Sequence, residues 1–345
     1  MIDSKRLMFR WVVPLAGGAV ALVLIFFLYS DLNFDTFLTK LQAADHKWIA
    51  ALAGAILLEQ LLNGWKWRQI LFDIKPVSSW RLTGALLAGY GANVLVPLGI
   101  SPFVRAWLIA RLEQMSMATV LTTTIIARFI DGIVFALFAG LVAMAGQIPR
   151  LEGNLELGLS IAGVLNLLLF GGLLWVMFRC RDLFAQEKFP LSRLFDWISA
   201  RFRIDGSALR HALCEGVVWP RSPARRGAVV LGAVTAKGVA ATHFLWAGLA
   251  VGLLLEPFDY LFLMVFAGFS LVLARFIRVP GGFIVGSALA LQLLGVADEQ
   301  ALAMILFSHV LMILLVVGLG LLVLWQNGID IRRARLASDS VKANP

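Results

Sequence analysis

The chain has 345 residues, of which 60% are hydrophobic and only 15% are charged. Soluble globular domains carry about 25% charged residues, so this composition excludes a soluble protein and indicates an all-α polytopic membrane protein. The apolar runs are continuous rather than alternating, which excludes a β-barrel, and the net charge of +9 lies mostly in the loops, so it does not call for nucleic acid.

Eight membrane spans are predicted within a single transmembrane domain over residues 11–326. The predicted spans cover residues 11–29, 48–67, 117–142, 157–178, 226–252, 258–277, 279–297 and 301–326. The segment 279–297 has an alternative, in which it dips into the membrane and returns on the same side.

The loop charges predict the orientation. Basic residues dominate the N-terminus (1–10), the loop at 66–81 and the tail (327–345), whereas the segment 30–47 is slightly acidic. Because Lys and Arg accumulate on the cytoplasmic side, both termini are expected in the cytoplasm and the protein in the cytoplasmic (inner) membrane.

One apolar stretch, residues 82–110, does not fit as a span. It is flanked by basic residues on both sides, including Arg111, and its middle contains Asn93, Pro97 and several glycines. Such residues break a helix, and lipid tolerates a broken backbone only where it is buried in protein or lines a cavity. A re-entrant hairpin from the cytoplasmic side is the simplest interpretation, and a kinked ordinary span is the alternative.

Arg128 and Asp131 lie one helical turn apart in the middle of the next predicted span. At ~1.5 Å per residue, Arg128 lies about 16 Å deep, near the bilayer midplane. Ionisable residues at such depth normally face a bundle interior or a wet cavity and mark function. The alternative is an internal ion pair between the two residues, which would only join helices.

The loop at 179–225 is basic, with an apolar stripe between Phe189 and Phe202. This pattern predicts an amphipathic helix in the cytoplasmic interface, although packing against a soluble helix would look the same. We expect this loop to bind a biosynthetic partner. The other expected association is a homo-oligomer.

A second break follows in the other half of the chain, at Pro280, Gly281 and Gly282. His309 lies 29 residues after Pro280, much as Arg128 lies 31 residues after Pro97. The similar spacing predicts an internal repeat, and paired broken helices indicate a transporter binding site near the midplane.

Five further polar residues in or beside the spans are secondary candidates for this site. For Glu59 and Asn63, a hydrogen bond to a neighbouring helix is the simpler interpretation, and Lys237 lies close enough to the basic end of its span to reach the interface. The secondary candidates are Glu59, Asn63, Arg111, Lys237 and His243.

These motifs together resemble the flippase-like transmembrane family shared with lysylphosphatidylglycerol synthases, over about residues 45–325. The resemblance is carried by four features in order along the chain. They are Trp65-Lys66-Trp67-Arg68; Asn93, Pro97 and Arg105; Arg128 with Asp131; and Pro280-Gly281-Gly282.

The chain also departs from this family's pattern. The family's Gly-acidic pair before Arg105 is Ser101-Pro102 here, no Glu follows Pro280-Gly281-Gly282, and His309 stands where the family often has Arg. The resemblance implies a domain that handles lipids. The family's lysyl transfer is not expected, because the chain ends about twenty residues after its last predicted span.

A lipid translocase is therefore the predicted function, acting on a polar-headgroup or isoprenoid-type lipid, with membrane lipids as partners. Arg128, Asp131, Asn93, Arg105 and His309 would supply a polar path. There is no nucleotide-binding motif and no metal-ligand spacing, so no cofactor is expected. One alternative is an accessory subunit of a lipid or envelope biosynthetic pathway. The other is a membrane-embedded lipid-modifying enzyme, for which the sequence supplies few catalytic residues.

Overall fold

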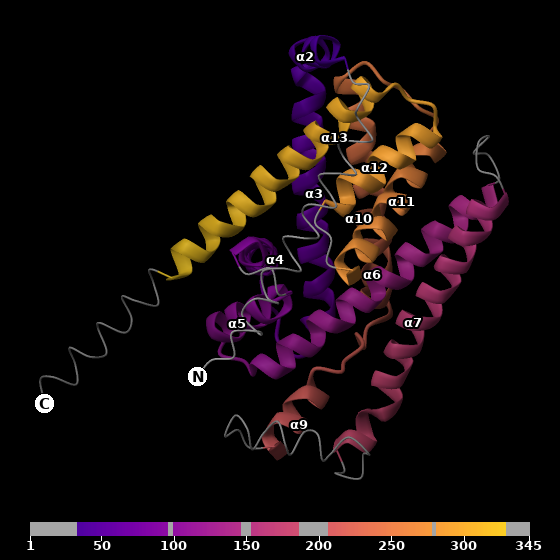
Figure 1. Ribbon diagram of the computed structural model, residues 1–345. Helices are drawn as coiled ribbons and strands as arrows, with labels where there is room; N and C mark the ends of the chain where they lie inside the picture. The colour runs from indigo at the N-terminus through magenta and orange to yellow at the C-terminus, as the bar shows by residue number, and fades with distance from the viewer. Residues whose placement is uncertain (1–32, 96–98, 146–152, 186–205, 278–280, 329–345) are drawn as a thin grey trace, which may run out of the picture. The chain divides into compact units, whose positions relative to one another are not determined.

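The computed structural model describes residues 33–95, 99–145, 153–185, 206–277 and 281–328. Within these ranges the chain forms eleven α-helices and no strand (Figure 1), which confirms the all-α prediction. The predicted span at 11–29 and the predicted interfacial helix at 189–202 lie outside the described residues.

The helix bounds follow the apolar runs closely. The helices are α2 (Phe34–Gln42), α3 (His46–Leu71), α4 (Ser79–Leu95), α5 (Ser101–Glu113), α6 (Met117–Ala145), α7 (Gly153–Ala185), α9 (Gly206–Glu215), α10 (Pro223–Ala250), α11 (Pro257–Ile277), α12 (Gly282–Leu293) and α13 (Asp298–Met312). After α13, a π-helical turn η1 (Ile313–Val317) leads without a break into a further helical segment that reaches Gly328.

Six of the described helices are long and apolar enough to cross a membrane. They are His46–Leu71, Met117–Met144, Leu157–Arg179, Pro223–Ala250, Pro257–Ala274 and Asp298–Gly328. Each coincides with a predicted span, so the structure has a helix of spanning length and composition for six of the eight predicted spans.

The predicted span at 279–297 is wrong. Its helix, α12, has only 12 residues, so it is about 18 Å long and cannot cross a hydrocarbon layer about 30 Å thick. The apolar run looked long enough because it includes the turn residues on either side of the helix.

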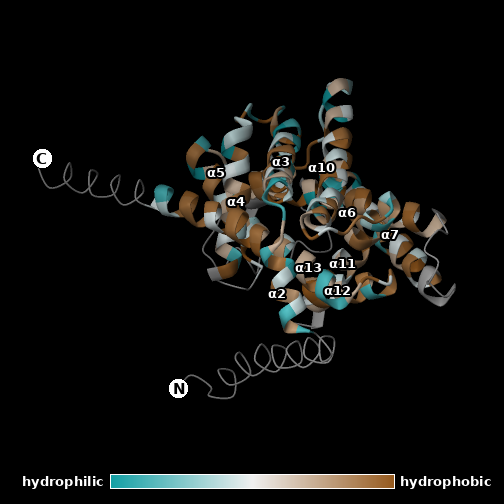
Figure 2. Cartoon of the chain, turned by 90° about the horizontal axis from the view of Figure 1, so that it is seen from above, coloured by the Kyte–Doolittle hydropathy of each residue, from teal (hydrophilic) through white to brown (hydrophobic). Residues whose placement is uncertain are grey.

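The helix α7 is the clearest candidate for contact with lipid. Only 6% of an 18-residue apolar window within Leu157–Arg179 is buried against the rest of the chain. Large apolar side chains such as Leu165, Leu168 and Trp175 are exposed, and the helix is predominantly hydrophobic in Figure 2. A helix that is hydrophobic on its exposed sides has to be covered by protein or by lipid, and lipid fits a chain with six helices of spanning length.

The chain divides into two compact units, each of which is described by itself. Unit 1 comprises Met1–Ile56, Phe135–Leu165 and Gly238–Leu311, and unit 2 comprises Leu57–Val134, Asn166–Lys237 and Met312–Pro345. Each unit contains one pair of helices around a break in the chain.

In unit 2 this pair is α4 and α5, which run antiparallel. The Asn93 side chain accepts a hydrogen bond from the backbone N–H of Ser101 at 3.1 Å, Gly89 faces Arg105, and Arg81 pairs with Glu113 at 2.6 Å. The outer ends of the two helices therefore lie together, and Gly99 adopts a positive φ of 71° in the turn. The predicted break is confirmed, although Pro97 itself lies outside the described residues.

In unit 1 the pair is α11 and α12, which is built in the same way. Gly282 lies against Ala274 and Gly286 against Ser270, so these helices are also antiparallel and closely packed. Their turn contains Gly281, whose φ is 83°.

Contacts within unit 1 also show that the α11–α12 pair starts and finishes at one end of the unit. The backbone N–H of Asp45 donates to the carbonyl oxygen of Ala250 at 3.0 Å, and the backbone N–H of Asn33 donates to the carboxylate of Glu299 at 3.3 Å. These bonds place the C-terminus of α10 and the N-terminus of α13 at the same end of unit 1. Because α10 leads into α11 and α12 leads into α13, the α11–α12 pair starts and finishes there.

The two pairs share one order of elements. In each, a helix is followed by a positive-φ glycine, a short helix of 13 or 12 residues, and a second positive-φ residue. That second residue is Gln114 (φ 52°) in unit 2 and Gly295 (φ 75°) in unit 1. A long helix then begins three residues later in both cases.

A close backbone contact joins α4 to the helical segment that follows η1. A Cβ on Gly320 would lie 2.1 Å from the carbonyl oxygen of Leu87, whereas a Cβ on Gly318 would meet nothing within 4 Å. Because backbone atoms cannot move aside cheaply, we expect Gly320→Ala to lower the free energy of unfolding by about 1–3 kcal/mol. Gly318→Ala is the matched control and should leave it unchanged. Thermal unfolding in detergent measures both, and equal melting temperatures for the two variants would contradict this packing.

Candidate functional site

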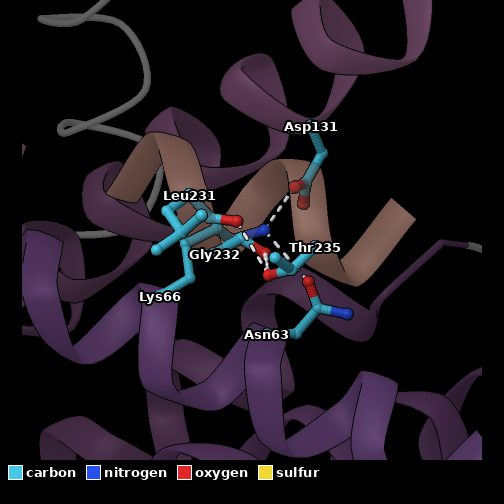
Figure 3. Close-up of polar contacts among 6 residues, drawn as sticks. All are labelled: Asn63, Lys66, Asp131, Leu231, Gly232 and Thr235. Atoms are coloured by element: carbon cyan, nitrogen blue, oxygen red, sulfur yellow. Dashed lines mark hydrogen bonds and ion pairs between the residues drawn. The ribbon is translucent and has the colours of Figure 1, made fainter. Parts of the chain in front are cut away.

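A buried lysine in α3 is the centre of the polar site in unit 2. Lys66 is only 1% exposed, although it lies in a helix long and apolar enough to span a membrane. Its ammonium donates hydrogen bonds to the carboxylate of Asp131 in α6 and to the side-chain oxygen of Asn63 at 3.0 Å (Figure 3). An ion pair between two apolar spans is costly to build, so it marks a position with a specific role.

The helix α10 closes one side of this site. A Cβ on Gly232 would lie 3.1 Å from the Cβ of Lys66 and 3.1 Å from the ring of Trp65, so α10 passes close to α3. The hydroxyl of Thr235, also drawn in Figure 3, donates a hydrogen bond to the carbonyl oxygen of Leu231 in the same helix at 2.7 Å. The hydroxyl proton of Thr235 is therefore committed to its own helix, and Lys66 takes its acceptors from Asp131 and Asn63.

A second contact fixes α3 against α6. The indole N–H of Trp67 donates to the hydroxyl of Thr123 at 3.1 Å, and that hydroxyl donates to the carbonyl of Val120 at 2.8 Å. Both Trp67 and Thr123 are buried. These two consecutive hydrogen bonds fix the position of α3 along α6. The ammonium of Lys66 is therefore held beside Asp131.

Arg128 does not form the internal ion pair with Asp131 that was the alternative interpretation. Asp131 is paired with Lys66, and no ion pair involves Arg128 among the residues that the structure describes. The Arg128 side chain is exposed instead. The interpretation of Arg128 and Asp131 as a mutual structural pair is therefore wrong, because a partner from α3 takes the carboxylate.

Arg105 forms the second part of the site, within the α4–α5 hairpin. It is only 4% exposed, and its guanidinium lies over the ring of Tyr90, 4.5 Å from the centroid. Arg128 and Asp131 are both close enough to act on its charge. We call Lys66, Asp131, Arg128 and Arg105 the charged region of unit 2, because Asp131 pairs with Lys66 and both Asp131 and Arg128 act on the charge of Arg105.

The candidate residues of unit 1 form an aromatic stack. Phe283, next to Gly282 at the start of α12, stacks on His309 of α13 at 5.2 Å between ring centroids and on Phe244 of α10 at 5.9 Å. Gly282 and Gly286 allow α12 to pack closely on α11, which positions Phe283. Gly281 lies in the turn before it, whereas Pro280 lies outside the described residues.

The secondary candidates are distributed over both units. Asn63 is in contact with Lys66, and Glu59 lies one turn before Asn63 on the same helix. Arg111 is exposed on α5 and, six residues after Arg105, lies on a different face of that helix, so it is not part of the charged region. Lys237 is partly buried on α10, and His243 is buried in unit 1.

Lys66 was missed as a site residue because its motif, Trp65-Lys66-Trp67-Arg68, was assigned to the end of a span. A signal for it does exist in the sequence. Glu59, Asn63 and Lys66 are spaced by four and three residues, so they form a polar stripe on one face of an otherwise apolar helix.

Comparison with known proteins gives one match. The family model described as the lysylphosphatidylglycerol synthase TM region matches residues 15–320. No curated protein and no solved structure matches the chain.

Proposed function

Because the chain belongs to the family of the lysylphosphatidylglycerol synthase TM region, we propose that it moves a lipid with a polar headgroup across the cytoplasmic membrane. The observation that carries this proposal is the buried Lys66, held by Asp131 and Asn63 between two helices able to span a membrane. The proposal includes no chemical reaction.

A headgroup that crosses a bilayer needs polar partners along its path, since each bare polar group in hydrocarbon costs several kcal/mol. The charged region of unit 2 offers cations from Lys66, Arg105 and Arg128 and a carboxylate from Asp131. The exposed guanidinium of Arg128 would make the first contact, because its planar fork of donors suits a phosphate group. Movement would be passive or coupled to an ion gradient.

The two hairpins support a transporter architecture. The helices α4, α5 and α12 have 17, 13 and 12 residues and are each shorter than a span. We propose that the α4–α5 hairpin enters from the cytoplasmic side, where Lys75, Arg81 and Arg111 cluster, and returns there. The α11–α12 hairpin would enter from the opposite side, as the second member of an inverted repeat.

Cysteine labelling tests this topology. In a background without Cys180 and Cys214, cysteines at Ser78 and Gln114 flank the first hairpin, and cysteines at Leu254 and Ala297 flank the second; all four positions are exposed. We expect a membrane-impermeant maleimide to label the first two only from the cytoplasmic side and the last two only from the outside. Labelling of Ser78 and Gln114 from opposite sides would make the first hairpin a kinked span instead.

The function itself is tested by lipid movement in proteoliposomes. Vesicles with the purified chain should move a fluorescent phospholipid between leaflets faster than protein-free vesicles, as measured by dithionite quenching. Anionic and neutral labelled lipids, compared side by side, begin to identify the cargo. Equal rates with and without the protein, at verified insertion and with an imposed proton gradient, would favour the accessory-subunit alternative.

A further inference from the structure

The buried guanidinium of Arg105 has donors for which the described residues provide no acceptor. Its Nε and Nη2 atoms are closed to solvent and have no hydrogen-bond partner among the described residues. Buried donors of a charged group that lack acceptors are unfavourable, because their hydration has been lost and the contact with the Tyr90 ring replaces only part of it. A ligand that accepts hydrogen bonds from these atoms would therefore offset much of the free-energy cost of their burial.

Ser101 presents another unused polar group at the same place. Its hydroxyl oxygen is buried and has no partner among the residues that are described. A Cβ on Gly89 would lie 2.5 Å from Nε of Arg105 and 2.7 Å from this hydroxyl, so both groups converge on the bare face of Gly89. Asn93 accepts the hydrogen bond of the Ser101 backbone N–H, which leaves the hydroxyl available.

The charge around this point is positive. The cations Arg105, Arg128 and Lys66 lie in the charged region against the single carboxylate of Asp131, which is already paired with Lys66. Glu59 adds a second negative charge, but it lies seven residues before Lys66 on α3, about 10 Å along the helix. A net positive charge between apolar helices attracts an anion.

We infer that the α4–α5 hairpin contains a binding site for a phosphate group, formed by Arg105 and the hydroxyl of Ser101, which both lie tightly against Gly89. The phosphate comes from a lipid headgroup if the proposed function holds, and free phosphate has the same chemistry. Since the donors are closed to solvent in the described conformation, the ligand enters when α4 and α5 separate. This inference deepens the proposed function by naming the group that is recognised.

Binding to the full chain in non-ionic detergent tests the site. The probes are dihexanoyl phosphatidylglycerol, inorganic phosphate, and dihexanoylglycerol as the lipid without phosphate, measured by microscale thermophoresis. We expect Arg105→Gln to weaken binding of the phospholipid about 10- to 100-fold, as expected for the loss of charge-assisted hydrogen bonds. Arg111→Gln is the matched control, since it removes the same charge from an exposed position of the same helix.

Ser101→Ala provides a second, milder variant in case Arg105→Gln does not fold. We expect it to weaken phospholipid binding about 5- to 10-fold and to leave the melting temperature unchanged. Competition by inorganic phosphate would show that the site takes the free ion as well, and a lack of competition would show that it requires the lipid.

Three outcomes would overturn the inference. They are phospholipid binding as tight in Ser101→Ala and Arg105→Gln as in the parent, equal losses in Arg105→Gln and Arg111→Gln, and no binding of either phosphate probe by the parent. A parent chain that binds phospholipid through Arg105 but moves no lipid would refute the proposed transport and leave this site standing.

Discussion

Replacing Lys66 with methionine is expected to lower the free energy of unfolding by about 3–5 kcal/mol, because it leaves the carboxylate of Asp131 without its partner between two apolar helices. Lys66 is almost completely buried, and Asp131 is partly buried, with 29% of its side chain exposed. The methionine side chain has nearly the volume of lysine without its charge, so little of the effect comes from packing. Reversible unfolding in mixed detergent micelles measures the change.

A double variant separates the charge from the packing. Lys66→Met combined with Asp131→Leu removes both charges, and such replacements of buried pairs by apolar residues are often neutral or stabilising. We expect it to regain most of the lost stability. Lys47→Met serves as a control at an ion pair whose lysine side chain is 67% exposed and should change little. A Lys66→Met protein as stable as the parent would show that the pair contributes nothing to folding.

Arg128→Gln is expected to slow lipid movement about tenfold or more while leaving stability unchanged. The Arg128 side chain is exposed and has no ion pair among the described residues, so its removal breaks no contact that holds the helices. A charge-assisted hydrogen bond to a phosphate contributes about 1.5–3 kcal/mol, which corresponds to this change in rate if it acts at the barrier. Dithionite quenching in proteoliposomes measures the rate, and the melting temperature in detergent checks the fold.

Arg111→Gln is again the matched control, because it removes an exposed arginine from a different part of unit 2. We expect it to move lipid at the parent rate. If both arginine variants slow movement equally, the effect comes from the overall charge of the protein, and Arg128 has no special place on the path.

The helices were predictable because length and apolar content in a bilayer leave few alternatives. The helices α3, α6 and α10 begin and end within four residues of the predicted spans, and α7 extends four residues before and seven residues beyond its predicted span. The break between α4 and α5 followed from Gly and Pro in mid-run. The end of α12 could not be predicted, because Leu294 and Gly295 are as apolar as a helix interior. Only the backbone conformation shows that they form a turn.

The partners within the site were not predictable, because they depend on contacts between distant segments. Asp131 had a cation one helical turn away in Arg128, and local spacing offered that pair as the alternative interpretation. Lys66 lies 65 positions earlier in the chain, and only the packing of α3 on α6 brings it to Asp131. Likewise, the basic character of Arg105 was evident, but its burial against Gly89 and Tyr90 depends on how α5 folds back on α4.

The most direct test of the proposed transport site is lipid movement by the Lys66→Met, Asp131→Leu double variant, compared with the parent at matched insertion. This variant keeps the helices packed but removes the charges that we place on the lipid path. We predict that it unfolds like the parent in detergent and moves the labelled phospholipid no faster than protein-free vesicles. A folded double variant that moves the lipid at the parent rate would contradict the account and make the pair of Lys66 and Asp131 a structural contact only.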